Sequence, residues 1–196
     1  MKVLVVDNYD SFVYNIVHLL YEIGVAEIDI IKNDQLDFSY INQYDKIVLS
    51  PGPGIPKNAG MMPQLLSEFA STKSILGICL GHQAIAEHFG TDLINLSEPL
   101  HGVASKIKIL KEDYLFENLP KHFKIGHYHS WVVSEAISDD LEIIAKDELG
   151  NIMAIKHKKH DVRGLQFHPE SILTENGKII LTNWINYVYC EHLNIE

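Results

Sequence analysis

The residue best suited to chemistry in this sequence is Cys79, which lies in the run Gly77-Ile78-Cys79-Leu80-Gly81. The apolar residues before it predict a strand and the residues after it predict a helix, so the cysteine falls on the turn between them. Glycines on both sides allow a sharp turn and close packing of strand and helix. The helix N-terminus favours thiolate over thiol. The pattern predicts a cysteine nucleophile, although a free cysteine is more often a small buried hydrophobe.

The candidate base for this cysteine is His168, in the segment Phe167-His168-Pro169-Glu170. Imidazole titrates near neutral pH and can hold a thiolate as an ion pair. Pro169 restricts the residue before it to extended backbone. Residues two apart in an extended stretch point to the same side, so Glu170 can orient the ring of His168. Cys79, His168 and Glu170 therefore form a candidate triad, and the alternative is a surface turn with an incidental charged pair.

A second loop, Pro51-Gly52-Pro53-Gly54, could bind the ligand. Its prolines stiffen the chain and its glycines allow close approach by a substrate. A backbone N–H of Gly52 or Gly54, together with that of Leu80, could form an oxyanion hole. Runs of Pro and Gly are more commonly rigid surface turns.

The elements that must position these residues alternate between short apolar strands and helices in the first half of the chain. We expect an α/β fold with a flavodoxin-like, open, mostly parallel sheet, helices on both faces and an antiparallel extension, in one domain over residues 1–196. Sites in such sheets form at the carboxyl ends of the strands, where Cys79, the glycine loop and Asp7-Asn8-Tyr9-Asp10 all fall. The expected strands are 2–6, 26–31, 46–49, 74–78, 104–110, 123–125, 141–145, 152–156 and 162–167, and the expected helices are 11–23, 63–71, the segment after Cys79, and 177–189, with Ile180, Trp184 and Val188 on one face.

The composition excludes several classes of function. A net charge of −10 argues against nucleic acid as a partner. No apolar run is long enough to cross a membrane, and the first residues do not resemble a signal peptide. The two cysteines, Cys79 and Cys190, are far apart in the sequence, which suits a reducing cytoplasm. Among 11 histidines, the pairs His127/His129 and His157/His160 lack a nearby carboxylate or cysteine at ligand spacing, so we expect no metal.

The segments Pro-Gly-Pro-Gly, Gly-Ile-Cys-Leu-Gly-His-Gln and His-Pro-Glu, in this order and spacing, resemble the class I (triad) glutamine amidotransferases. The runs Asp7-Asn8-Tyr9-Asp10-Ser11-Phe12 and Tyr128-His129-Ser130-Trp131 make the chain similar to the glutaminase subunits (component II) of anthranilate synthase and aminodeoxychorismate (para-aminobenzoate) synthase. The resemblance covers essentially the whole chain.

The resemblance implies a role for each matching residue. Cys79 would attack the side-chain amide of L-glutamine to give a γ-glutamyl thioester and ammonia, His168 would move the proton, and Glu170 would orient His168. The remaining roles would be an oxyanion hole from Gly52 and Leu80, and substrate binding by Gly52, Pro53, Gly54, Gln83, Ser130 and Trp131. One departure is Val103, which stands where relatives often have lysine after His101-Gly102.

The same resemblance implies a chorismate-using synthase subunit (component I) as protein partner, which would carry the Mg²⁺, and no cofactor in this chain. The product could be anthranilate, for tryptophan, or aminodeoxychorismate, for folate. The alternatives are a stand-alone γ-glutamyl hydrolase or another cysteine-elbow hydrolase, and an inactive regulatory module of the same fold. Such a module would be expected to lose Cys79 or His168, and both are present.

Overall fold

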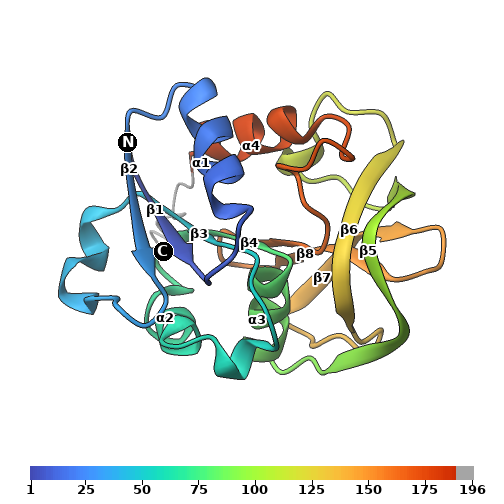
Figure 1. The fold of residues 1–196 in the computed structure, drawn as a ribbon, viewed down its shortest axis with the longest axis horizontal. Coiled ribbons are helices and arrows are strands. Elements are labelled where there is room, and N and C mark those ends of the chain that lie inside the picture. The colour runs from blue at the N-terminus through green and yellow to red at the C-terminus, as the bar shows by residue number, and fades with distance from the viewer. Residues whose placement is uncertain (189–196) are drawn as a thin grey trace, which may run out of the picture.

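A single nine-stranded sheet organises residues 1–188, which are the residues that the computed structural model describes. The strand order is β2-β1-β3-β4-β9-β8-β7-β5-β6. Helices cover both faces of this sheet, with α1 and α4 on one side and α2 and α3 on the other (Figure 1). The expected α/β architecture is therefore confirmed.

The first half of the sheet is parallel and forms the framework of the site. Its strands are β2 (Glu27–Lys32), β1 (Lys2–Asp7), β3 (Lys46–Leu49), β4 (Ser74–Ile78) and β9 (Val162–Leu165). Strands β3, β4 and β9 are buried along their whole length, as expected for strands covered on both faces. Strand β9 comes last in the sequence but pairs directly with β4, which places the segment after Leu165 beside the segment after Ile78.

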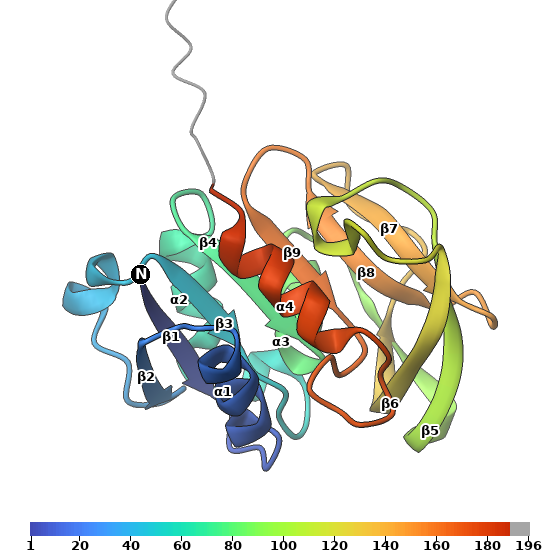
Figure 2. The same cartoon turned by 90° about the horizontal axis from the view of Figure 1, so that it is seen from above.

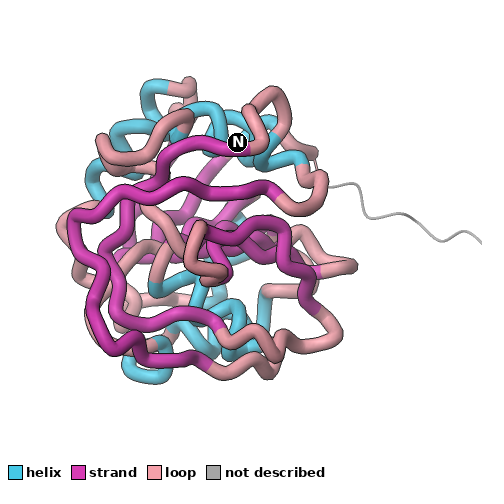
Figure 3. The backbone as a smooth tube through the Cα atoms, turned by 90° about the vertical axis from the view of Figure 1, so that its right-hand side faces the viewer, coloured by secondary structure: helices cyan, strands magenta, loops and turns pink. Residues whose placement is uncertain are grey.

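The other half of the sheet is antiparallel and is larger than the sequence pattern indicated. It consists of β8 (Ile152–His157), β7 (Leu141–Asp147), β5 (Leu93–Ile109) and β6 (His122–Val133). Two of these strands, β5 and β6, extend well beyond the expected 104–110 and 123–125. Polar residues, Pro99 and Gly102 break the apolar pattern, but β5 and β6 stay paired on both sides of the two interruptions in their ladder. Figure 3 shows these strands (magenta) curving around one side of the molecule.

Each face of the sheet has its own apolar core, and β1 contributes to both by alternation. Val3 and Val5 pack with α1 (Val13–Glu22) and α4 (Gly177–Asn186), which lie across the same face in Figure 2. Leu4 and Val6 pack on the other face with α2 (Met62–Phe69) and α3 (Leu80–His88). Short 3₁₀ segments connect these elements: η1 (Phe38–Gln43), η2 (Pro56–Asn58) and η3 (Tyr114–Phe116).

The last helix is shorter than expected. It ends at Asn186, while Tyr189, the expected end, lies outside the described residues, as does Cys190. Trp184 is buried as expected, but Val188 lies beyond the helix and is 75% exposed. No helix in the described part of the chain is both long and apolar enough to span a membrane.

Candidate active site

Cys79 occupies a strained turn between β4 and α3. Its backbone has φ 52° and ψ −100°, an unfavourable conformation for a side-chain-bearing residue. The Cys79 N–H donates to the carbonyl of Leu165 at 2.8 Å, which ties the turn to the end of β9. Both flanking glycines are required sterically, because a Cβ on Gly77 would lie 2.4 Å from the Gly81 backbone, and one on Gly81 would lie 2.3 Å from the Leu49 carbonyl oxygen. The geometry is that of a nucleophile elbow.

His168 and Glu170 form a buried pair immediately after β9. Nδ1 of His168 lies 2.7 Å from Oε1 of Glu170, and both side chains are almost inaccessible to solvent. Burial lowers the pKa of His168, but the Cys79 and Glu170 side chains outweigh burial and raise that pKa to about 10. Nε2 of His168 makes no hydrogen bond of good geometry within residues 1–188, although the nearby Cys79 side chain contributes most to raising the His168 pKa. His168 is therefore protonated at neutral pH when it faces a thiolate.

Aromatic rings hold the imidazole of His168 in place. The Phe12 ring lies 5.1 Å from the His168 ring and the Tyr128 ring lies 4.9 Å from it, both at steep angles. Phe12 and Tyr128 also contact each other at 4.9 Å. Sequence reasoning assigned neither ring a role, although both belong to the two runs that narrowed the family resemblance.

The glycine loop is anchored by Asn8, at the end of β1. The Asn8 N–H donates to Oγ of Ser50 at 2.9 Å, and its side-chain amide donates to the Ser50 carbonyl at 2.8 Å. A Cβ on Gly52 would lie 2.5 Å from Cβ of Asn8 and 2.6 Å from Cδ2 of Leu80. Only glycine fits there, so the backbone of Gly52 packs closely against Asn8 and the Leu80 side chain. Neither the Gly52 N–H nor the Leu80 N–H donates a hydrogen bond within the described chain.

The outer part of the same loop is more open. Pro53 and Gly54 are exposed, and Gly54 has φ +77° with free space around it. The fold therefore presents these two residues to solvent beside the oxyanion-hole candidates Gly52 and Leu80.

Gln83 of α3 contacts the backbone of Trp131 in β6, directly after Ser130. Nε2 of Gln83 donates to the carbonyl of Trp131 at 2.9 Å. The regular β5–β6 ladder is interrupted between the pairs Asn95–Trp131 and Leu100–His129, opposite Ser130. This interruption takes the backbone of Ser130 out of the regular ladder at the point where the resemblance implies substrate contacts.

One buried residue that sequence reasoning missed is Gln166. Its Nε2 donates to Sγ of Cys79 at 3.7 Å, and its Oε1 accepts from Nε2 of Gln83 at 3.2 Å. Gln166 is fully buried. The only sequence signal was its position two residues before His168, which places both side chains on the same side of an extended segment.

The histidine pair on β6 belongs to the interior. Nδ1 of His127 lies 3.0 Å from Nε2 of His129, and Nε2 of His127 lies 2.6 Å from Oγ of Ser105. Burial lowers the pKa of both rings, that of His129 to about 3, so the pair is neutral. Across residues 1–188, no group of three or more His, Cys, Asp and Glu side chains could hold a metal ion.

Val103, the residue after His101-Gly102, is 44% exposed and lies opposite His127 in the β5–β6 pairing.

His82 provides a test of how burial affects stability. Burial lowers the pKa of this fully buried ring to about 3 from 6.5. Between these values the unfolded chain binds a proton that the folded chain excludes, so the free energy of unfolding must fall as the pH is lowered through this window. We expect His82→Met to reduce this slope by about 1.4 kcal/mol per pH unit. Urea unfolding at a series of pH values measures both slopes, and equal slopes would contradict the prediction.

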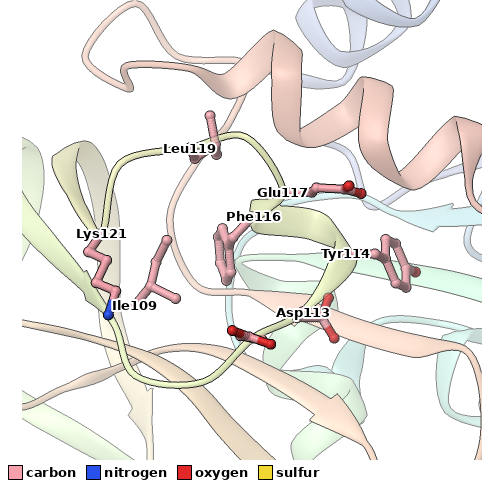
Figure 4. A pocket seen from close by; sticks show the side chains of 8 residues that line it. Ile109, Asp113, Tyr114, Phe116, Glu117, Leu119 and Lys121 are labelled. Atoms are coloured by element: carbon pink, nitrogen blue, oxygen red, sulfur yellow. The ribbon is translucent and has the colours of Figure 1, made fainter.

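A cavity of about 560 Å³ lies outside the predicted site (Figure 4). Its apolar floor includes Phe116 and Leu119, and Glu112 and Glu117 contribute charge. The carboxylate of Asp113, which also lines the cavity, is already paired with Arg163 at 3.0 Å. None of the lining residues belongs to the predicted site.

Two solved structures have the same fold as this chain. A structure from Thermoplasma acidophilum that is assigned to GMP synthase superposes with a TM-score of 0.85 at 28% identity, covering 94% of this chain and 92% of the other. A glutamine amidotransferase from Thermotoga maritima superposes with a TM-score of 0.74 at 14% identity, covering 94% and 96%. The architecture is therefore that of the glutamine amidotransferases.

The family is shown by sequence. A family model described as glutamine amidotransferase class-I matches residues 4–187, so the chain belongs to the class-I glutamine amidotransferase family. Anthranilate synthase component 2 of Lactococcus lactis is 42% identical over 191 residues, covering 95% of this chain and 94% of that protein. The protein of that name from Pseudomonas putida is 38% identical over 193 residues, covering 94% and 96%. A bifunctional protein TrpGD of Thermotoga maritima is 43% identical over 189 residues, and these cover 94% of this chain but only 32% of the relative, so the chain spans about a third of that protein.

Proposed function

We propose that this chain is the glutaminase subunit of an anthranilate synthase and that Cys79 is its nucleophile. The observation that carries the proposal is the strained Cys79 turn beside the buried His168–Glu170 pair, whose Nδ1–Oε1 distance is 2.7 Å. The names of the relatives favour anthranilate over aminodeoxychorismate as the product.

The reaction begins when the thiolate of Cys79 attacks the side-chain carbonyl carbon of glutamine. The N–H groups of Gly52 and Leu80 stabilise the oxyanion of the tetrahedral intermediate. His168 donates its proton to the departing nitrogen, the C–N bond breaks, and ammonia leaves a γ-glutamyl thioester. His168 then takes a proton from water, whose oxygen attacks the thioester to release glutamate and restore the thiolate. The net reaction converts glutamine and water into glutamate and ammonia.

The glutamine itself would lie between the glycine loop and β6. Pro53 and Gly54 would border the substrate on one side, and Ser130 and Trp131 would offer backbone groups to its α-amino and α-carboxylate ends. Gln83 uses its side-chain N–H groups on Trp131 and Gln166, so only its Oε1 is left for the substrate. A zwitterionic substrate such as glutamine needs hydrogen-bond donors and acceptors more than a large apolar pocket, and these residues supply them.

Ammonia reacts as a nucleophile only while it is unprotonated, so a shielded transfer is useful. We propose that a chorismate-using synthase subunit, which binds the Mg²⁺, docks over the edge that carries Cys79. The exposed side chain of Ile172, two residues after Glu170, supports an interface there because it is 97% accessible and apolar. No cofactor is proposed for this chain.

A reactive glutamine analogue tests the nucleophile directly. A chloroketone in place of the side-chain amide should alkylate Cys79, with loss of chloride, and excess glutamine should slow the labelling. Mass spectrometry of the labelled chain identifies the modified residue. A thiol that does not react would support the inactive regulatory module instead.

A reconstitution test separates the remaining functions. With glutamine, chorismate and Mg²⁺, this chain should support anthranilate formation by an anthranilate synthase component I, and the synthase should raise the rate of glutamine hydrolysis. Formation of aminodeoxychorismate only, with the corresponding synthase, would assign the chain to the other pathway. Equal glutaminase rates with and without either synthase would favour a stand-alone hydrolase.

A further inference from the structure

The carbonyl of Trp131 determines how two buried amide side chains are oriented. A carbonyl oxygen can only accept hydrogen bonds, and this one lies 2.9 Å from the Gln83 amide. The NH₂ group of Gln83, and not its oxygen, must therefore point toward Trp131. The second N–H of the same NH₂ group reaches Oε1 of Gln166 at 3.2 Å.

The orientation of Gln83 in turn fixes that of Gln166. If the amide of Gln166 were rotated by half a turn, its NH₂ would face the NH₂ of Gln83, and its oxygen would face the sulfur of Cys79. Both contacts would be repulsive when the sulfur is a thiolate. In the observed arrangement the oxygen of Gln166 accepts from Gln83, and its NH₂ lies 3.7 Å from Sγ of Cys79.

Burial and a backbone hydrogen bond fix the position of Gln166 beside Cys79. The residue is fully buried directly after β9, and its backbone N–H donates to the carbonyl of Met153 at 2.9 Å. The sulfur is also shielded, since Cys79 is only 6% exposed. A thiolate with so little access to water depends on protein donors for its stability.

We propose that Gln166 stabilises the Cys79 thiolate by donating a side-chain N–H to the sulfur, and that Gln83 and the Trp131 carbonyl act as positioning groups that aim this donor. The inference rests on the proposed function of Cys79 as the nucleophile. It gives Cys79 two partners on the segment after β9, His168 with its positive charge and Gln166 with a neutral donor. The amide N–H of Gln166 is too weak an acid to protonate the thiolate. The sulfur therefore keeps its negative charge and remains able to attack.

Alkylation of Cys79 by iodoacetamide reports the thiolate without involving glutamine. The sulfur forms a bond to the methylene carbon as iodide leaves, and mass spectrometry follows the Cys79 peptide separately from Cys190. Gln166→Met has similar volume and no donor. We expect it to be alkylated about tenfold more slowly than the wild type at about pH 7, with the two rates converging at alkaline pH. Gln64→Met, on an exposed glutamine that pairs with Glu68, is the matched control and should behave as the wild type.

The rate of Cys79 alkylation tests the role of Gln166, and glutamine hydrolysis tests the proposed function of Cys79. Superimposable pH profiles of alkylation for Gln166→Met and the wild type would overturn the role of Gln166 even if Cys79 remains essential for glutamine hydrolysis. Hydrolysis that survives loss of the Cys79 thiol would instead refute the nucleophile. If Gln166→Met does not fold by circular dichroism, Gln166→Glu replaces it, because it keeps the oxygen facing Gln83. Its carboxylate beside the sulfur should slow alkylation at neutral pH at least as much, and an unchanged rate would overturn the inference.

Discussion

Replacement of Cys79 by serine is expected to abolish glutamine hydrolysis, with a loss of about four orders of magnitude or more. The two side chains have nearly the same size, and both must adopt the same φ of 52°, so the turn itself should persist. The serine hydroxyl is a far weaker acid than a thiol. The variant also loses the sulfur of Cys79, which contributes most to raising the pKa of His168, so the thiolate–imidazolium pair that supplies a ready nucleophile cannot form.

The control for this variant is the complex with the synthase supplied with an ammonium salt. If the fold and the docking surface are intact, ammonia from solution should support amination at the rate of the wild-type complex, while glutamine should not. Steady-state production of glutamate and of the aminated product distinguishes the two nitrogen sources. Substantial glutamine-dependent activity of the serine variant would show that another residue performs the attack.

Replacement of Gly177 by alanine is expected to damage both stability and activity. A Cβ at this position would lie 1.8 Å from the carbonyl oxygen of Pro169, which stands between His168 and Glu170. Backbone atoms cannot move aside as a flexible side chain can, so α4 or the segment 168–170 must shift. We expect the free energy of unfolding to fall by about 3 kcal/mol, or about 6–12 °C in Tm, with at least a tenfold loss of glutaminase activity.

Gly24→Ala is the matched control because this glycine has open space around it and a φ of +95°. Alanine there suffers only the backbone strain, about 1 kcal/mol. Thermal unfolding and glutamine hydrolysis of both variants should therefore separate the steric clash from the general cost of losing a glycine. A Gly177→Ala variant as stable and active as Gly24→Ala would contradict the close packing of α4 against Pro169.

The parts of the site that could be predicted from the sequence are those encoded locally. Cys79 was recognisable because the glycines that permit its turn are two residues away on each side. His168 and Glu170 were predicted to meet because residues two apart in an extended stretch point to the same side. The structure brings them within 2.7 Å, but through a turn, in which the Ser171 N–H donates to the His168 carbonyl at 3.2 Å. Strands β3 and β4 were predicted at their observed bounds since each is a short, mostly apolar segment that begins with one polar residue.

The parts that could not be predicted depend on contacts between distant segments. Asn8 reaches Ser50 across 42 positions and Gln166 reaches Cys79 across 87, and no periodicity in the sequence reveals either contact. The length of β5 and β6 was missed for a different reason. Their polar residues pair in the ladder through backbone groups, which the hydrophobic pattern does not report.

The pairing of β9 with β4 also determines when the chain can acquire activity. During synthesis β4, which precedes Cys79, emerges long before β9, which precedes His168, and β9 must insert between β4 and β8 in the middle of the sheet. Such high contact order makes completion of the sheet a late step of folding. Until β9 is in place, Cys79 lacks His168 and Glu170 beside it. Any chemistry that needs all three side chains therefore requires the finished sheet.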